Sequence, residues 1–264
     1  MNLYSAAMNP AFAYALRVLL NWLVLLGPVV PLAAIAVLAT KRSTAPATER
    51  RPYGLLALVA ALFLLDLACL LAPRLAVIPP GMNWQGKVLE CIWVIAFAAT
   101  GLGGSFSALG LGWQPEPRDR VWPALAIATL LALCFPAYGL FIGARLPTDA
   151  ATVIYELTLP GLAEEMVFRG VFQSLFNQVF GRPWKLLGAQ VGWGFILSTA
   201  MFTIGHGMLF SKSLHLQTSF VGMLPALYAG LILGWMRERA GSIWPGVVVH
   251  NATNIVIVIG SMFL

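Results

Sequence analysis

Long apolar segments separated by short loops dominate this chain and restrict it to one class of fold. An α-helix needs about 20 mostly apolar residues to cross the roughly 30 Å hydrocarbon core of a bilayer. Of the 264 residues, 59% are hydrophobic and only 10% are charged, and the mean hydropathy is +0.83. Charged residues make up about 25% of an average soluble domain. The sequence therefore predicts an all-α, polytopic transmembrane bundle of about eight helices.

The apolar segments and the loops between them indicate one integral membrane domain over residues 1–264. Lys and Arg are concentrated in the loops after the first, third, fifth and seventh segments, which predicts that both termini face away from the cytoplasm. The pair Pro160-Gly161 is expected to interrupt the fifth helix. The predicted segments are 11–39, 54–71, 88–109, 121–142, 152–180, 186–210, 220–236 and 243–264.

The net charge of +6 does not indicate a nucleic-acid partner, because the basic residues are scattered over short loops. The expected partner is the lipid bilayer, in a prokaryotic cytoplasmic (inner) membrane. Two glycine pairs with G-x-x-x-G spacing, Gly188/Gly192 and Gly230/Gly234, predict places where helices approach closely.

Three charged residues stand together in the fifth apolar segment, where a charge is costly and is usually paired or functional. Glu165 and Arg169 are four residues apart on one helical face, which predicts an internal ion pair. Glu164 points about 100° away and is left unpaired, which makes it a candidate general base. The Pro160-Gly161 break is expected to place both glutamates near a helix N-terminus. A purely structural network of the three charges is the alternative.

Two further polar stripes lie in the sixth and eighth segments. Phe202 and His206 share one helical face, and so do His250 and Asn254. Taken singly, His206 could be a core histidine bonded to the backbone. His250 and Asn254 could simply form hydrogen bonds that hold neighbouring helices together. The third histidine, His215, lies in a loop and is expected to be solvated.

Together the three stripes resemble the CPBP family, a group of intramembrane CAAX prenyl proteases and bacteriocin-processing proteins. That family carries E-E-x-x-x-R, F-x-x-x-H and H-x-x-x-N or H-x-x-x-D on successive late helices of a bundle. Here these motifs read EEMVFR, FTIGH and HNATN, in the same order. The resemblance covers residues 155–264, which would carry the catalytic core, whereas the first 120 residues match only as apolar spans.

The resemblance implies a glutamate-dependent intramembrane endopeptidase acting on a membrane-associated protein or peptide. It implies that Glu164 activates a water molecule and that His206 orients this water and shuttles its proton. It also implies that His250 and Asn254 face the scissile carbonyl and stabilise the oxyanion. The residues expected to brace the site from behind are Glu165, Arg169 and Phe202.

Zinc is the main mechanistic alternative to this metal-free reading. Glu164, His206 and His250 could supply three ligands and leave a fourth position open. The motif H-E-x-x-H is absent, however, and the three candidate ligands come from different helices. We therefore expect no cofactor. Ser198 and Thr199 lack a histidine at helical spacing in their own segment, which weakens a serine-protease reading.

Two other functions compete with a protease. The same fold could serve as a non-enzymatic membrane scaffold or immunity protein, with the polar stripes as glue between helices. A small proton-coupled transporter could use an intramembrane carboxylate and histidine as a relay. Transporters are often built from repeated halves, and no such repeat is visible in this sequence.

Overall fold

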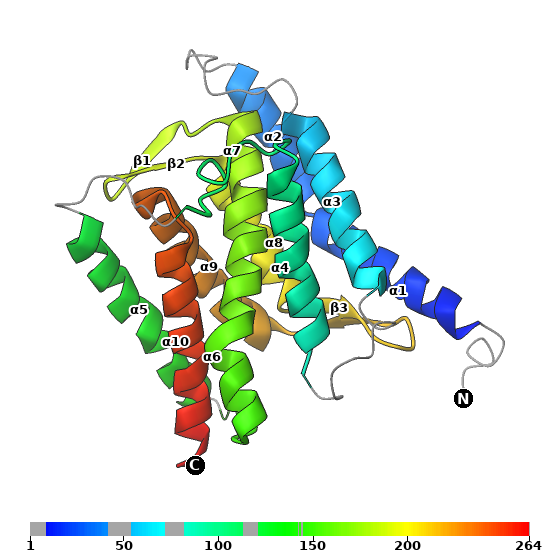
Figure 1. Ribbon diagram of the computed structural model, residues 1–264, viewed down its shortest axis with the longest axis vertical. Helices are drawn as coiled ribbons and strands as arrows, with labels where there is room; N and C mark the ends of the chain where they lie inside the picture. The colour runs from blue at the N-terminus through cyan, green and yellow to red at the C-terminus, as the bar shows by residue number, and fades with distance from the viewer. Residues whose placement is uncertain are drawn as a thin grey trace.

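The computed structural model describes residues 9–41, 54–71, 82–112, 121–141, 143 and 145–263, and these residues form a bundle of helices with two short β-hairpins (Figure 1). The predicted all-α bundle is confirmed. Its helices are α1 (Pro10–Leu26), α2 (Val29–Lys41), α3 (Gly54–Leu71), α4 (Trp84–Ala99), α5 (Val121–Phe141), α6 (Ala150–Glu164), the π-helix η4 (Glu165–Phe172), α7 (Gln173–Phe180), α8 (Trp193–Gly205), α9 (Phe220–Ala240) and α10 (Trp244–Ser261).

Most of the predicted segments correspond to helices or to helices joined end to end. The sixth segment (186–210) differs, because α8 covers only Trp193–Gly205 and a short strand lies on either side of it. The third segment also differs, because α4 begins at Trp84 and ends at Ala99. The side chain of Asn83 caps this helix by accepting a hydrogen bond from the backbone N–H of Gly86, so the helix begins four residues before the apolar run does. The predicted orientation relies on loops that include residues 42–53 and 113–120, which lie outside the described residues.

Apolar side chains cover much of the outer surface, as an integral membrane protein requires. The stretches Pro10–Ala39, Val121–Phe141 and Phe220–Ala240 are long and apolar enough to cross a bilayer. On α5, Trp122, Leu130 and Phe141 are between 59% and 88% exposed. In water such a surface would favour aggregation, whereas in lipid it is matched to its surroundings.

Glycines bring α9 close to α8, as their spacing predicts. A Cβ atom on Gly230 would lie 3.1 Å from Thr199, and one on Gly234 would lie 3.0 Å from Phe195. The second predicted glycine contact is wrong. Gly188 lies at the turn of the hairpin β1 (Trp184–Leu186) to β2 (Ala189–Val191), with φ +81°, and Gly192 precedes α8. These glycines therefore serve a turn and a helix start rather than helix packing.

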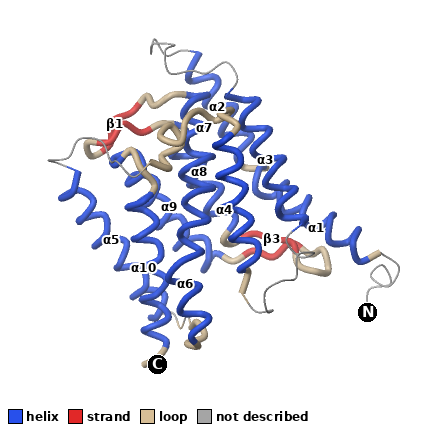
Figure 2. Tube along the Cα trace, in the orientation of Figure 1, coloured by secondary structure: helices blue, strands red, loops and turns tan. Residues whose placement is uncertain are grey.

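The two hairpins lie at opposite ends of the bundle (Figure 2). The second pairs β3 (Met208–Phe210) with β4 (Leu216–Thr218) and carries the exposed His215 in its loop, as predicted for a solvated histidine. Near the first hairpin, the carboxylate of Glu238 on α9 accepts hydrogen bonds from Gln173, Asn177 and Arg182. This buried cluster ties α7 to α9 and fixes the helices that follow the EEMVFR motif.

The fifth segment forms one continuous helix made of α6, η4 and α7. It begins after Asp149, whose carboxylate accepts hydrogen bonds from the hydroxyl and the backbone N–H of Thr152 and from the backbone N–H of Ala151. The side-chain bond from Thr152, followed by the backbone bonds, lowers the pKa of Asp149 below its usual range.

The predicted break at Pro160-Gly161 is wrong, because α6 continues through both residues. A proline inside a helix removes one hydrogen bond and displaces the carbonyl four residues earlier. Here the side chain of Asn251 on α10 hydrogen-bonds to the backbone on either side of Pro160. Its amide oxygen accepts from the backbone N–H of Gly161 at 2.9 Å, and its amide nitrogen donates to the carbonyl of Thr158 at 3.1 Å. The two glutamates thus lie within a long helix and not at a helix N-terminus.

Candidate active site

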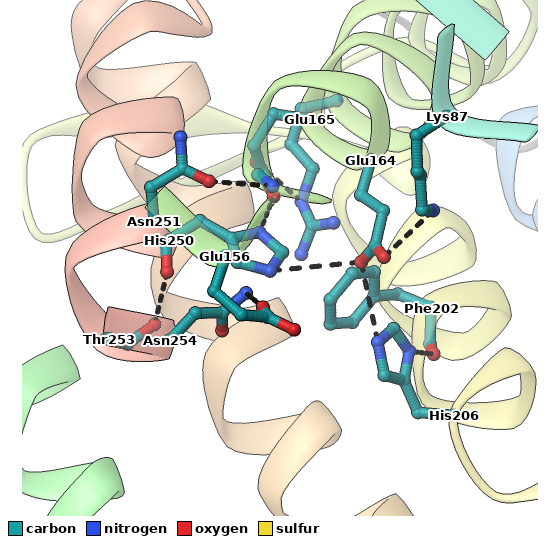
Figure 3. A network of polar contacts seen from close by, with 12 residues as sticks. Lys87, Glu156, Glu164, Glu165, Phe202, His206, His250, Asn251, Thr253 and Asn254 are labelled. Carbon is teal, nitrogen blue, oxygen red and sulfur yellow. Dashed lines mark hydrogen bonds and ion pairs between the residues drawn. The ribbon is translucent and has the colours of Figure 1, made fainter. Parts of the chain in front are cut away.

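Glu164 lies at the junction of α6 and η4, where side chains from three other helices meet it (Figure 3). Its Oε2 is 3.4 Å from Nε2 of His206, the residue that caps the C-terminus of α8, and 3.8 Å from Nε2 of His250 on α10. The side chains of Glu164, His206 and His250 are 13%, 37% and 10% exposed. One residue from each of the three sequence motifs therefore lies at this point, and both Nε2 atoms are directed at one oxygen of Glu164.

Hydrogen bonds fix the ring orientation of both histidines. Nδ1 of His206 is 2.7 Å from the backbone carbonyl of Phe202, and Nδ1 of His250 is 2.9 Å from Oε1 of Glu165. A backbone carbonyl can only accept, so Nδ1 of His206 carries a proton; the carboxylate of Glu165 assigns the same tautomer to His250. Each histidine therefore uses Nδ1 for support and turns Nε2 towards Glu164, an arrangement suited to taking up or giving a proton.

A buried ion pair supports the site from behind. Nε of Arg169 is 3.3 Å from Oε2 of Glu165, and the two side chains are 1% and 0% exposed, so the predicted pair is present. The guanidinium of Arg169 also lies 4.1 Å from the ring centroid of Phe202, a distance typical of cation–π contacts. Phe202 in turn meets the ring of His250 edge-on, with the centroids 6.0 Å apart. Glu165, Arg169 and Phe202 thus form one packed support under both histidines.

Asn254 faces a carboxylate that the sequence motifs do not include. Its Nδ2 donates to Oε2 of Glu156 on α6 at 2.9 Å, which assigns the orientation of the amide because a carboxylate only accepts. An amide nitrogen carries two N–H groups, so one remains for another acceptor. Glu156 lies two helical turns before Glu164 on the same helix, and is half-buried.

The prediction that Glu164 is unpaired is wrong, because Lys87 on α4 reaches it. Nζ of Lys87 is 3.0 Å from Oε1 of Glu164 and 3.0 Å from Oε2 of Glu90. The sequence held a signal for this contact, since Glu90 is a charged residue inside an apolar helix. Beginning the third segment at residue 88 excluded Lys87 and concealed the pairing of residues 87 and 90 within one turn.

Neither hydroxyl considered as a possible nucleophile is free to act as one. Ser198 is buried and donates to the carbonyl of Phe168 at 2.7 Å, and Thr199 donates to the carbonyl of Gly230 at 3.2 Å. The bond from Ser198 ties α8 to the π-helix η4. Such π-helical segments are uncommon and are often found at functional sites. The two hydroxyl groups therefore hold helices together.

The three candidate zinc ligands, Glu164, His206 and His250, lie close together beside a lysine. Within the part of the chain that the structure describes, no group of three or more His, Cys, Asp or Glu side chains is arranged to hold a metal ion. In addition, the ammonium of Lys87 lies against Glu164, where it would repel a second cation.

Comparison with protein families agrees with the motifs. Residues 146–256 match the family described as Type II CAAX prenyl endopeptidase Rce1-like. The matched range contains all three motifs and excludes Lys87 and Glu90. Comparisons with curated proteins and with solved structures gave no match.

Proposed function

We propose that this chain, whose residues 146–256 belong to the Rce1-like family of CAAX-type intramembrane endopeptidases, hydrolyses its substrate with a water molecule activated by Glu164. The observation that supports this most strongly is the convergence of Nε2 of His206 and Nε2 of His250 on Oε2 of Glu164. Peptide hydrolysis needs a base, a proton carrier and oxyanion donors around one point. The substrate class is a membrane-associated protein or peptide.

In the first proposed step, Oε2 of Glu164 removes a proton from water while the water oxygen bonds to the scissile carbonyl carbon. The carbonyl π electrons move to the oxygen and give a tetrahedral oxyanion. His206, whose Nε2 faces the same oxygen of Glu164, orients the water and accepts its proton in turn. The support of Nδ1 by the Phe202 carbonyl holds the ring in place for this task.

In the second step the oxyanion collapses and the C–N bond breaks. The proton taken from water passes to the leaving nitrogen through Glu164 or His206, so the products are a carboxylic acid and an amine. Asn254 supports the oxyanion through the amide N–H that Glu156 does not occupy. His250 supports it from Nε2 when its ring carries both protons, with Glu165 bonded to Nδ1.

This proposal is metal-free, and zinc held by Glu164, His206 and His250 is its chemical alternative. Zinc would supply a bound hydroxide as nucleophile, so that the glutamate would be a ligand rather than the base. The contact between Lys87 and Glu164 favours the metal-free form. A scaffold or immunity protein, or a proton-coupled transporter, would need no cleavage at all, so product analysis separates these functions from a protease.

The test is cleavage of a membrane-anchored peptide by the purified protein in liposomes, with the products identified by mass spectrometry. His206→Ala and His250→Ala are compared with His215→Ala, a matched control because His215 is exposed and outside the site. We expect the first two variants to lose activity by at least about 100-fold and the control to retain it. Equal activity in all three variants would contradict the proposal.

A chelator arm decides between the two mechanisms. The metal-free mechanism predicts an unchanged rate after prolonged incubation with a membrane-permeant chelator. Loss of activity that zinc alone restores would establish the zinc alternative. Absence of cleavage across a panel of membrane peptides, together with wild-type folding, would favour the scaffold or transporter function.

A further inference from the structure

Lys87 is the one cation that approaches Glu164 from outside the region of the family match, among the residues that the structure describes. It lies in the first turn of α4, and its Nζ is 3.0 Å from both Oε1 of Glu164 and Oε2 of Glu90. The side chains of Lys87, Glu90 and Glu164 are only 14%, 19% and 13% exposed. A charge so poorly solvated needs a partner, and Lys87 has two.

The contacts divide the two oxygens of Glu164 between different tasks. Oε1 faces the ammonium of Lys87, whereas Oε2 faces Nε2 of His206 and of His250. A carboxylate with one oxygen held by an ammonium cannot rotate freely, so its other oxygen stays directed at the histidines. Glu90 holds Lys87 from one helical turn further along α4, which limits the freedom of the long lysine side chain.

The charges around the site show why a cation is needed there. Glu165 is adjacent in sequence, but Arg169 already pairs with it, and the two histidines engage acceptors through Nδ1. Without Lys87, Glu164 would lose the ammonium that faces its Oε1 in a poorly solvated environment, which favours protonation of a carboxylate. A protonated Glu164 could not take a proton from water.

We propose that Lys87, anchored by Glu90, is a positioning residue of the proteolytic site that keeps Glu164 ionised and directs its Oε2 towards the two histidines. This inference rests on the proposed function, in which Glu164 is the base. It extends the working site beyond residues 146–256 to helix α4. The amino-terminal half of the chain therefore contributes to the chemistry as well as to the membrane anchor.

The kinetic test compares Lys87→Met and Lys87→Arg with Lys185→Met, a matched control on the exposed strand β1. We expect Lys87→Met to lower kcat by about 100-fold, the cost of misplacing a catalytic group, with KM changed by less than about threefold. Lys87→Arg keeps the charge, and its kcat should be at least about tenfold higher than that of Lys87→Met. Wild-type kcat in Lys87→Met, or no rescue by arginine, would overturn the proposal.

A second test needs no protease activity and so separates this proposal from the proposed function. The thermal stability of Lys87→Met, Glu164→Gln and the double variant is measured in detergent. If Lys87 serves Glu164, the loss of stability in Lys87→Met should fall by at least about half when Glu164 is already glutamine. If the stability losses of the two single variants simply add in the double variant, the role of Lys87 is rejected even when the wild type cleaves its substrate. A smaller loss in the double variant supports the contact between Lys87 and Glu164 even when no substrate is found. Lys87→Gln, which also removes the charge, serves in this cycle if Lys87→Met fails to fold.

Discussion

Replacing Glu165 with glutamine would leave the guanidinium of Arg169 charged within the bundle after the loss of its partner. The two side chains are 0% and 1% exposed, with Nε of Arg169 3.3 Å from Oε2 of Glu165. Within the described residues no hydrogen bond reaches the three guanidinium nitrogens, so the charge is held by the ion pair and by the rings of Phe202 and Phe168. Removing one partner of a buried pair costs about 3–5 kcal/mol, and we expect Glu165→Gln to fall in this range.

The reverse substitution should cost less. In Arg169→Met the carboxylate of Glu165 keeps the hydrogen bond from Nδ1 of His250 and can become neutral by taking up a proton, whereas arginine stays charged. We expect a loss of about 1–3 kcal/mol for this variant. The double variant Glu165→Gln/Arg169→Met replaces the pair by neutral side chains and should lie within about 2 kcal/mol of the wild type.

The assay is equilibrium unfolding in mixed micelles with increasing SDS, followed by tryptophan fluorescence, for which the chain has 9 tryptophans. The predicted order of stability is wild type, double variant, Arg169→Met and then Glu165→Gln. A cost of less than about 1 kcal/mol for Glu165→Gln, or a double variant that costs the sum of the singles, would refute the argument from a buried charge.

Three further predictions concern residues around the site. Asn251→Ala removes the acceptor of the Gly161 N–H and should lower the free energy of unfolding by about 1–3 kcal/mol. The control Thr253→Ala should lower it by less than about 0.5 kcal/mol in the same SDS titration. Gly234→Val forces α9 away from Phe195 and should lower both the melting temperature and the yield of folded protein; an unchanged melting temperature would contradict the close packing. Ser198→Ala should retain cleavage within about tenfold, because its hydroxyl serves the Phe168 carbonyl; complete loss with intact folding would revive a serine nucleophile.

Apolar length and motif order were enough to predict the helical bundle and to select Glu164, His206 and His250, whose side chains lie close together. Helices α3, α5, α9 and α10 lie close to their predicted bounds because long apolar runs between polar loops leave a membrane chain few alternatives. The pair Glu165–Arg169 followed from helical spacing alone.

The features that the sequence did not predict depend on contacts between distant segments. Helix α6 continues through Pro160, and Asn251, from α10, hydrogen-bonds to the backbone on either side of it. Local propensity contains no information about that distant residue. The π-helix η4 is equally invisible to spacing rules, which assume α-helical geometry. Lys87 was missed for a different reason: a boundary placed four residues too late removed it from the membrane, although Glu90 was visible inside the apolar run.

Glu164 is proposed as the base that activates water. The most direct measurement of this role compares the cleavage rates of Glu164→Gln and the wild type on one membrane-anchored peptide in proteoliposomes. Glutamine keeps the shape of the side chain and removes its ability to take a proton. We predict that the rate falls by at least about 100-fold while the circular dichroism spectrum is unchanged. Cleavage by a folded Glu164→Gln protein at a rate near that of the wild type would contradict the account.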